Sequence, residues 1–72
     1  MKKTYKLKDL DCANCAAKMQ NAIAKLDGVQ DVNVNFMGQR MTIELVDARA
    51  DEIMRQVVET VKRIEPDCVV VI

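Results

Sequence analysis

The chain of 72 residues is half hydrophobic and 31% charged, and its 11 basic and 11 acidic side chains leave no net charge at pH 7. This length predicts one domain over residues 1–72, with a single modest core. The balanced charge and the aromatic content of 3% exclude a nucleic-acid-binding protein that relies on a basic surface and on base stacking.

The first half of the chain predicts a strand, a helix and a second strand. Residues 4–9 alternate between apolar and polar side chains, which is the period of a β-strand. From Asn14 to Leu26 apolar residues recur every three or four positions, as in an amphipathic helix, and Gly28 is expected to end that helix. Residues 29–36 alternate again and predict the next strand.

The second half again predicts a strand, a helix and a strand. Gly38 interrupts the alternation, which resumes over residues 41–45, so the two strands around it are expected to form a hairpin. Residues 50–64 have helical spacing, with acids in the first turn and bases in the last, and Pro66 follows as a stop. The tail, residues 67–72, is strongly β-prone.

The resulting order is strand, helix, strand, strand, helix, strand. It predicts an α+β fold, the ferredoxin-like βαββαβ sandwich, in which a four-stranded antiparallel sheet carries both helices on one face. Met19, Met41 and Met54 fall on the apolar sides of these elements, so we expect them in the core and not in a soft-metal site.

The chain has three cysteines and no histidine. Two of the cysteines lie too close together to staple a fold, which indicates a reducing compartment and thiols used for chemistry. The absence of histidine removes the commonest general base and the commonest nitrogen ligand of metals. No apolar run approaches the roughly 20 residues of a membrane-spanning helix, so we expect no direct insertion into a membrane.

Cys12 and Cys15 lie at the predicted start of the first helix, directly after Asp11. Backbone N–H groups and the helix dipole favour negative charge there, so the pKa of a thiol is lowered and thiolate forms more readily. With two residues between them, both sulfurs can converge on one ion. A redox-active dithiol and a pair of small core residues are the alternatives.

The sequence resembles the heavy-metal-associated domain, a small module of copper chaperones and of the amino-terminal tails of heavy-metal P-type ATPases. The resemblance is carried by LDCANCAAK at residues 10–18, LDGV at 26–29 and VNVNF at 32–36, and it covers nearly the whole chain. It implies that Cys12 and Cys15 bind the metal.

Two neighbouring positions differ from copper-binding members of that family. Leu10 stands where methionine is usual, and we interpret it as packing beneath the loop. Asp11 stands where copper domains usually have a neutral residue, whereas zinc, cadmium and lead exporters tend to have aspartate, so the resemblance implies that Asp11 is a third ligand. The chemistry agrees, because Cu⁺ is satisfied by two soft thiolates while Zn²⁺ and Cd²⁺ accept more ligands and more negative charge. A helix N-cap is the alternative role for Asp11.

The third cysteine is expected near the same end of the fold. An antiparallel last strand beside the first would place its start close to the two other thiols. Cys68 is therefore a candidate additional metal ligand, and Glu65 and Asp67 are weaker candidates. A small apolar residue on a sheet face is the alternative for Cys68.

Together these inferences predict a metal-binding domain, not an enzyme by itself, that exchanges Zn²⁺, Cd²⁺ or Pb²⁺ with the thiolates of a partner. The resemblance implies that the partner is the transport core of a heavy-metal P-type ATPase, in the same chain, or a metal-donor protein. We expect a cytoplasmic domain of a cell-membrane protein, mostly monomeric, with a metal-bridged dimer as an alternative state. A copper(I) chaperone or copper-ATPase domain and a dithiol oxidoreductase remain as other functions.

Overall fold

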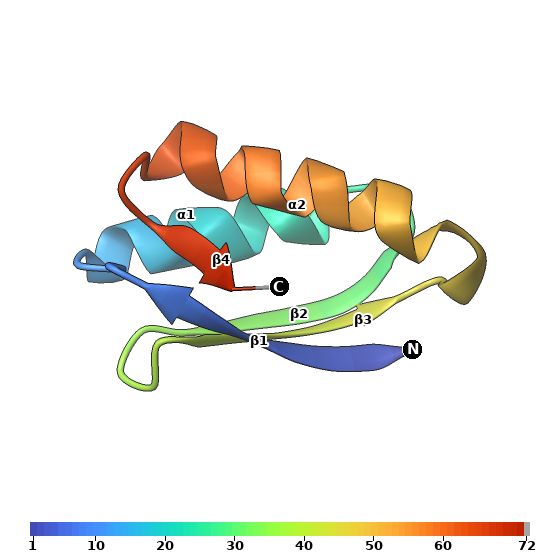
Figure 1. Ribbon diagram of the computed structural model, residues 1–72, viewed down its shortest axis with the longest axis horizontal. Coiled ribbons are helices and arrows are strands. Elements are labelled where there is room, and N and C mark those ends of the chain that lie inside the picture. Colours follow the sequence, from blue (N-terminus) through green and yellow to red (C-terminus); the bar gives the residue numbers. More distant parts are fainter. Residues whose placement is uncertain (72) are drawn as a thin grey trace.

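The structure is a computed structural model that describes residues 1–71, and it is a four-stranded antiparallel sheet with two helices on one face (Figure 1). The strand order is β2-β3-β1-β4. The elements in chain order are β1 (Lys2–Lys8), α1 (Ala13–Ala24), β2 (Val29–Asn35), β3 (Arg40–Leu45), the 3₁₀ turn η1 (Asp47–Arg49), α2 (Ala50–Ile64) and β4 (Val69–Val71). This arrangement confirms the predicted ferredoxin-like fold. Ile72, the end of the predicted last strand, lies outside the described residues.

The bounds of α1 differ from the prediction, whereas those of α2 agree with it. α2 has the predicted bounds, but α1 ends at Ala24, where the N–H of Lys25 bonds to carbonyls of the last turn. The prediction that Gly28 ends the helix is therefore wrong. Gly28 belongs to the following turn, where its φ is 94°. Within residues 1–71 neither helix has the length and hydropathy to cross a membrane.

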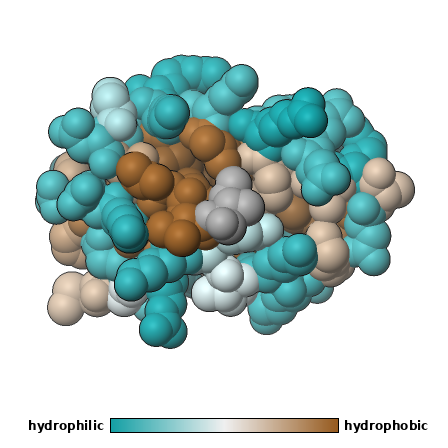
Figure 2. Space-filling view, in the orientation of Figure 1, coloured by the Kyte–Doolittle hydropathy of each residue, from teal (hydrophilic) through white to brown (hydrophobic). Residues whose placement is uncertain are grey.

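β4 is a short edge strand that covers only part of β1. It pairs antiparallel with the last residues of β1, with Lys8 opposite Val69 and Lys6 opposite Val71. This register confirms the prediction that the start of the last strand lies beside the end of the first. In Figure 2 a hydrophobic area lies over β4, where Val69 is 49% and Val71 38% exposed.

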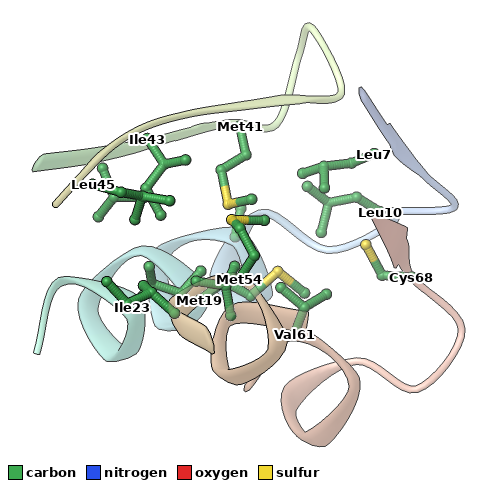
Figure 3. Close-up of a cluster of buried hydrophobic side chains, with 14 residues drawn as sticks. Leu7, Leu10, Met19, Ile23, Met41, Ile43, Leu45, Met54, Val61 and Cys68 are labelled. Atoms are coloured by element: carbon green, nitrogen blue, oxygen red, sulfur yellow. The ribbon is translucent and has the colours of Figure 1, made fainter. Parts of the chain in front are cut away.

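The core lies between the sheet and the two helices (Figure 3). Met19 and Met41 are fully buried and Met54 is 8% exposed, which confirms that these methionines are core residues. Met37, in the hairpin loop, is 89% exposed. The core is completed mainly by Leu7, Leu10, Ile23, Ile43, Leu45, Ile53, Val57, Val61 and Cys68.

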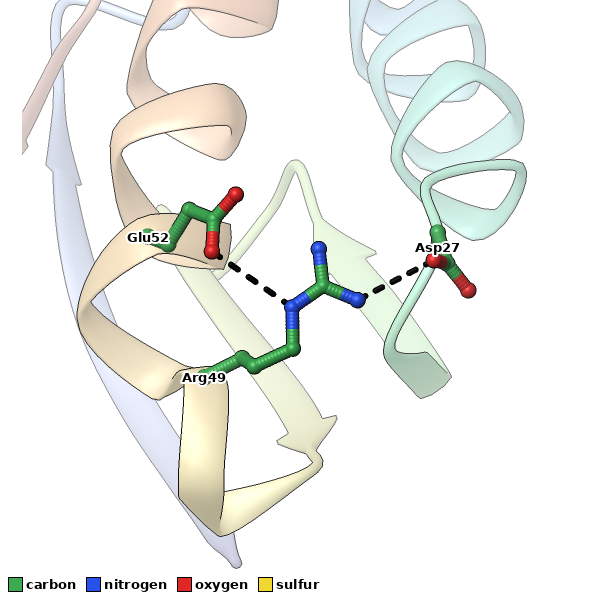
Figure 4. A network of polar contacts seen from close by, with 3 residues as sticks. All are labelled: Asp27, Arg49 and Glu52. Carbon is green, nitrogen blue, oxygen red and sulfur yellow. Dashed lines mark hydrogen bonds and ion pairs between the residues drawn. The ribbon is translucent and has the colours of Figure 1, made fainter.

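A polar network links the turn after α1 to the start of α2 (Figure 4). The Arg49 guanidinium contacts Asp27 at 3.0 Å and Glu52 at 3.4 Å. All three side chains are exposed, so water and salt screen these pairs, and they orient the turn after α1 more than they stabilise the fold.

Candidate metal centre

The segment between β1 and α1, residues 9–12, is here called the thiol loop. Asp9 turns the chain out of β1 with a positive φ of 60°. Leu10 then buries its side chain in the core and is only 2% exposed, which confirms the prediction that it packs beneath the loop. The following residues are thereby held at the surface, directly above the core.

Cys12 is the N-cap of α1. Its backbone is extended, its Sγ accepts a hydrogen bond from the N–H of Cys15 at 3.2 Å, and its carbonyl accepts one from the N–H of Ala16 at 3.0 Å. The alternative of Asp11 as N-cap is therefore wrong, and the carboxylate of Asp11 is exposed and not used by the helix.

The two thiols have opposite electrostatic environments. A hydrogen bond from the Cys15 thiol, followed by the backbone N–H groups of Cys15 and Asn14, lowers the pKa of Cys12. The same hydrogen bond, burial and the negative charges of Cys12 and Glu65 raise the pKa of Cys15 to about 11. The predicted lowering is thus right for Cys12 and wrong for Cys15, because one thiolate is stabilised by the proton of the other.

This asymmetry predicts the order in which the thiols of the reduced, metal-free protein react. At pH 8 the thiolate fraction of Cys15 is roughly 100-fold below that of an unperturbed thiol, and the higher nucleophilicity of its thiolate recovers only about tenfold. We expect iodoacetamide to modify Cys12 at least about ten times faster than Cys15, and the buried Cys68 most slowly. Mass spectrometry of peptides measures the three rates. Equal rates at Cys12 and Cys15 would contradict this geometry.

A carboxylate of α2 also reaches the thiol pair. Oε2 of Glu65, the C-cap of α2, accepts a hydrogen bond from Sγ of Cys15 at 3.7 Å. From sequence Glu65 is one of the weaker candidates, although Pro66 signals the end of α2 there and the neighbouring β4 must return beside β1. Asp67 is exposed in the turn that follows.

Cys68 lies below the thiol loop, in the core. It is 1% exposed, and its thiol is drawn among Leu10 and Val61 in Figure 3. Burial raises the pKa of Cys68. The negative charges of the carboxylates of Glu65, Asp9 and Asp11 raise it further. Cys68 thus has the environment of a small apolar core residue, close beneath a charged surface.

The structure brings together Cys12, Cys15 and Glu65, with Asp11 one residue ahead of the pair. Nowhere in residues 1–71 are three or more cysteine or carboxylate side chains already arranged around a common point that could hold an ion. Two thiols at the start of α1, flanked by carboxylates from two segments, nevertheless place soft and hard donor atoms in one region of the surface.

Comparison with known proteins gives a consistent family. A family model described as "Heavy-metal-associated domain" matches residues 4–67. The cadmium, zinc and cobalt-transporting ATPase of Bacillus subtilis is 32% identical over 66 residues, and the zinc/cadmium/lead-transporting P-type ATPase of Escherichia coli is 35% identical over 57 residues. These matches cover 92% and 79% of this chain but only 9% and 7% of the relatives.

Solved structures of similar fold include a copper(I) ATPase domain and a metallochaperone. The N-terminal domain of the copper(I) ATPase PacS in its apo form superimposes with a TM-score of 0.78 and 25% identity, covering 100% of this chain and 92% of that one. The CopZ metallochaperone gives a TM-score of 0.77 at 17% identity, covering 99% and 100%. The second likeness shows the fold alone.

The paired thiols, the ferredoxin-like sheet and the family match therefore all point to the same family of domains. The matched family is a metal-binding one whose relatives are parts of P-type ATPases, so this domain by itself is not catalytic. The chain belongs to the heavy-metal-associated domain family.

Proposed function

We propose that this domain binds a divalent ion, Zn²⁺ or Cd²⁺ and also Pb²⁺, through the thiolates of Cys12 and Cys15 and a carboxylate of Asp11. The observation that carries the proposal is the position of the two thiols at the start of α1 with carboxylates on both sides, Asp11 before them and Glu65 at 3.7 Å from Cys15. Similarity to cadmium- and zinc-transporting ATPases supports the same ions.

Charge and coordination number favour a divalent ion at this site. Two thiolates and one carboxylate carry three negative charges, which exceed the charge of Zn²⁺ by one but that of Cu⁺ by two. Zn²⁺ takes four ligands and accepts sulfur together with carboxylate oxygen, so Glu65 can supply the fourth. Its charge raises the excess to two for Zn²⁺ and to three for Cu⁺, so the divalent ion remains the better match. Cys68 is not in the proposed ligand set, because its thiol is buried in the core.

The proposed activity is transfer of the ion by ligand exchange. Cys12 and Cys15 are half-buried at the surface, so the thiolates of a partner can enter the coordination sphere before the first ligands leave. The names of the relatives favour the transport core of a heavy-metal P-type ATPase in the same polypeptide as that partner, with a separate metal-donor protein as the source of the ion. The domain would then work in the cytoplasm, beside the membrane that holds the transport core. It would be mostly a monomer, and two copies that share one ion would form a dimer.

A copper(I) domain is the second candidate, because the solved structures of similar fold include the N-terminal domain of the copper(I) ATPase PacS at 25% identity. Two thiolates suffice for Cu⁺, and neither carboxylate would be needed. A dithiol oxidoreductase is a third, since paired thiols can also exchange with a protein disulfide. Titrating the reduced protein with Zn²⁺, Cd²⁺ and Cu⁺ against a competing chelator, beside an insulin-reduction assay, separates the three functions.

The carboxylate is tested by Asp11→Asn, which keeps the size of the side chain and removes its charge. We expect the dissociation constants for Zn²⁺ and Cd²⁺ to rise about 100-fold, as for the loss of one ligand worth roughly 3 kcal/mol, and that for Cu⁺ to change less than about threefold. The chelator competition measures all three.

Asp9→Asn is the matched control for that variant. It removes one negative charge from the same loop, and asparagine tolerates the positive φ of this position. We expect it to weaken Zn²⁺ binding only about twofold, through loss of a screened charge. If both variants, or all three ions, were affected equally, Asp11 would contribute only long-range charge and would not be a ligand.

A further inference from the structure

One side chain of the hairpin between β2 and β3 reaches across to the thiol loop. The side-chain amide of Gln39 accepts a hydrogen bond from the N–H of Leu10 at 3.1 Å and donates one to the carbonyl of Leu10 at 2.7 Å. The same Nε2 also donates to the carbonyl of Phe36, within the hairpin, at 2.9 Å. One half-buried amide thus satisfies both backbone groups of Leu10, as a neighbouring strand would.

Gln39 closes the hairpin turn with a left-handed backbone. Its φ is 52°, in the left-handed region that favours glycine, and its carbonyl accepts a hydrogen bond from the N–H of Leu7 at 2.8 Å. Glycine would adopt this conformation without strain and keep the bond to Leu7. What glutamine adds is the amide that holds Leu10, and a strained backbone retained by its surroundings is a sign of such a role.

The clamp at Leu10 fixes one end of a very short segment. The other end is Cys12, which is held by its capping bond to Cys15 and by the N–H of Ala16. Asp11 is the only residue between these two fixed points. Any freedom gained at Leu10 therefore passes directly to the carboxylate of Asp11 and to the thiol of Cys12.

We propose that Gln39 is a positioning residue for the metal centre: its amide locks Leu10 and so holds Asp11 and Cys12 where they can close on an ion. This inference rests on the proposed function of the thiol loop. Groups that orient metal ligands without touching the metal are worth 10- to 100-fold in affinity elsewhere. Gln39 acts one residue further away, on the backbone, and comes from a hairpin distant in sequence from the thiols.

Gln39→Gly is the decisive variant, because it removes the amide while relieving the backbone strain, so the domain is expected to stay folded. We expect the dissociation constant for Zn²⁺ to rise about tenfold, mostly through faster release to a chelator in stopped-flow. In the metal-free protein, hydrogen exchange at the Leu10 amide, measured by NMR, is expected to accelerate at the same time, since this N–H loses its acceptor.

Asn35→Ala is the matched control. The Oδ1 of Asn35 accepts a hydrogen bond from the N–H of Gly38 at 2.8 Å, so this variant loosens the same hairpin without touching the thiol loop. We expect it to leave Zn²⁺ release and Leu10 exchange unchanged. Equal effects of both variants, or unchanged release in Gln39→Gly, would overturn the positioning role. If the wild-type protein failed to bind Zn²⁺ or Cd²⁺ at all, the proposed function would fall and the positioning role with it, while the Leu10 exchange would still report whether the clamp exists.

Discussion

Replacing both Cys12 and Cys15 with serine is expected to lower the affinity for Zn²⁺ and Cd²⁺ at least about a thousandfold and to remove stoichiometric uptake at micromolar protein. Structural zinc sites with four ligands bind with roughly 10–16 kcal/mol, or about 3 kcal/mol for each ligand, so two thiolates account for about 6 kcal/mol. Serine hydroxyls recover only a small part of that. Titration against a chelator, together with the thiolate-to-Cd²⁺ charge-transfer absorbance, measures the loss.

The double variant is expected to remain folded, which makes its loss of binding interpretable. Serine is a stronger N-cap than cysteine, so position 12 keeps the hydrogen bond to the N–H of residue 15. Position 15 is only half-buried, so a hydroxyl there remains accessible to water. Circular dichroism and the urea midpoint should therefore stay close to those of the wild type.

Cys68→Ala is the control for the remaining thiol. It removes one buried sulfur and should cost about 1 kcal/mol of stability through the small cavity left behind. We expect its affinity for Cd²⁺ and its charge-transfer absorbance per ion to match the wild type. A lower absorbance per ion would bring Cys68 into the ligand set, and undiminished binding by the Cys12/Cys15 double variant would place the ion elsewhere.

The fold was predictable because hydrophobic periodicity is strong and regular in this chain. The stripe of α2 is continuous and bounded by charged turns and Pro66, so the predicted bounds of that helix match those observed. Antiparallel pairing of β4 with β1 follows from the order of the elements, and it places Glu65 and Cys68 at the end of the sheet where the thiols lie. These features depend on local pattern and topology, which a sequence contains.

The details of the metal centre depend on tertiary contacts, and the sequence does not contain them in readable form. Whether Asp11 or Cys12 caps α1 is a choice between adjacent residues that the entry angle of the loop decides. The unequal thiol pKa values arise from the direction of one hydrogen bond and from the approach of Glu65. The clamp by Gln39 joins positions 29 residues apart, and no spacing rule connects them.

The role of Gly28 in stability likewise depends on a tertiary contact that the sequence does not reveal. Its replacement is the second substitution with a large expected effect. The sequence favoured a helix stop, but the structure places Gly28 in the turn before β2, with a φ of 94° and its carbonyl fixed by the N–H of Val46 at 3.0 Å. A Cβ atom at this position would overlap Cδ1 of Ile53 and lie 3.2 Å from its Cγ1. Ile53 is fully buried on α2, so neither the turn nor the helix can move aside easily.

Gly28→Ala is therefore expected to destabilise the domain by about 2–4 kcal/mol, with about 1 kcal/mol from the positive φ and the rest from overpacking against Ile53. A domain of this size has a free energy of unfolding of roughly 4–11 kcal/mol, so the variant loses a large share of it. Urea unfolding should show a much lower midpoint with an unchanged slope.

Gly38→Ala is the matched control, since its Cβ would meet only the exposed side chain of Asn35, at 3.2 Å from Nδ2. It should shift stability by less than about 1 kcal/mol. Equal losses in both variants would mean that flexibility of the chain, and not the contact with Ile53, requires glycine at position 28.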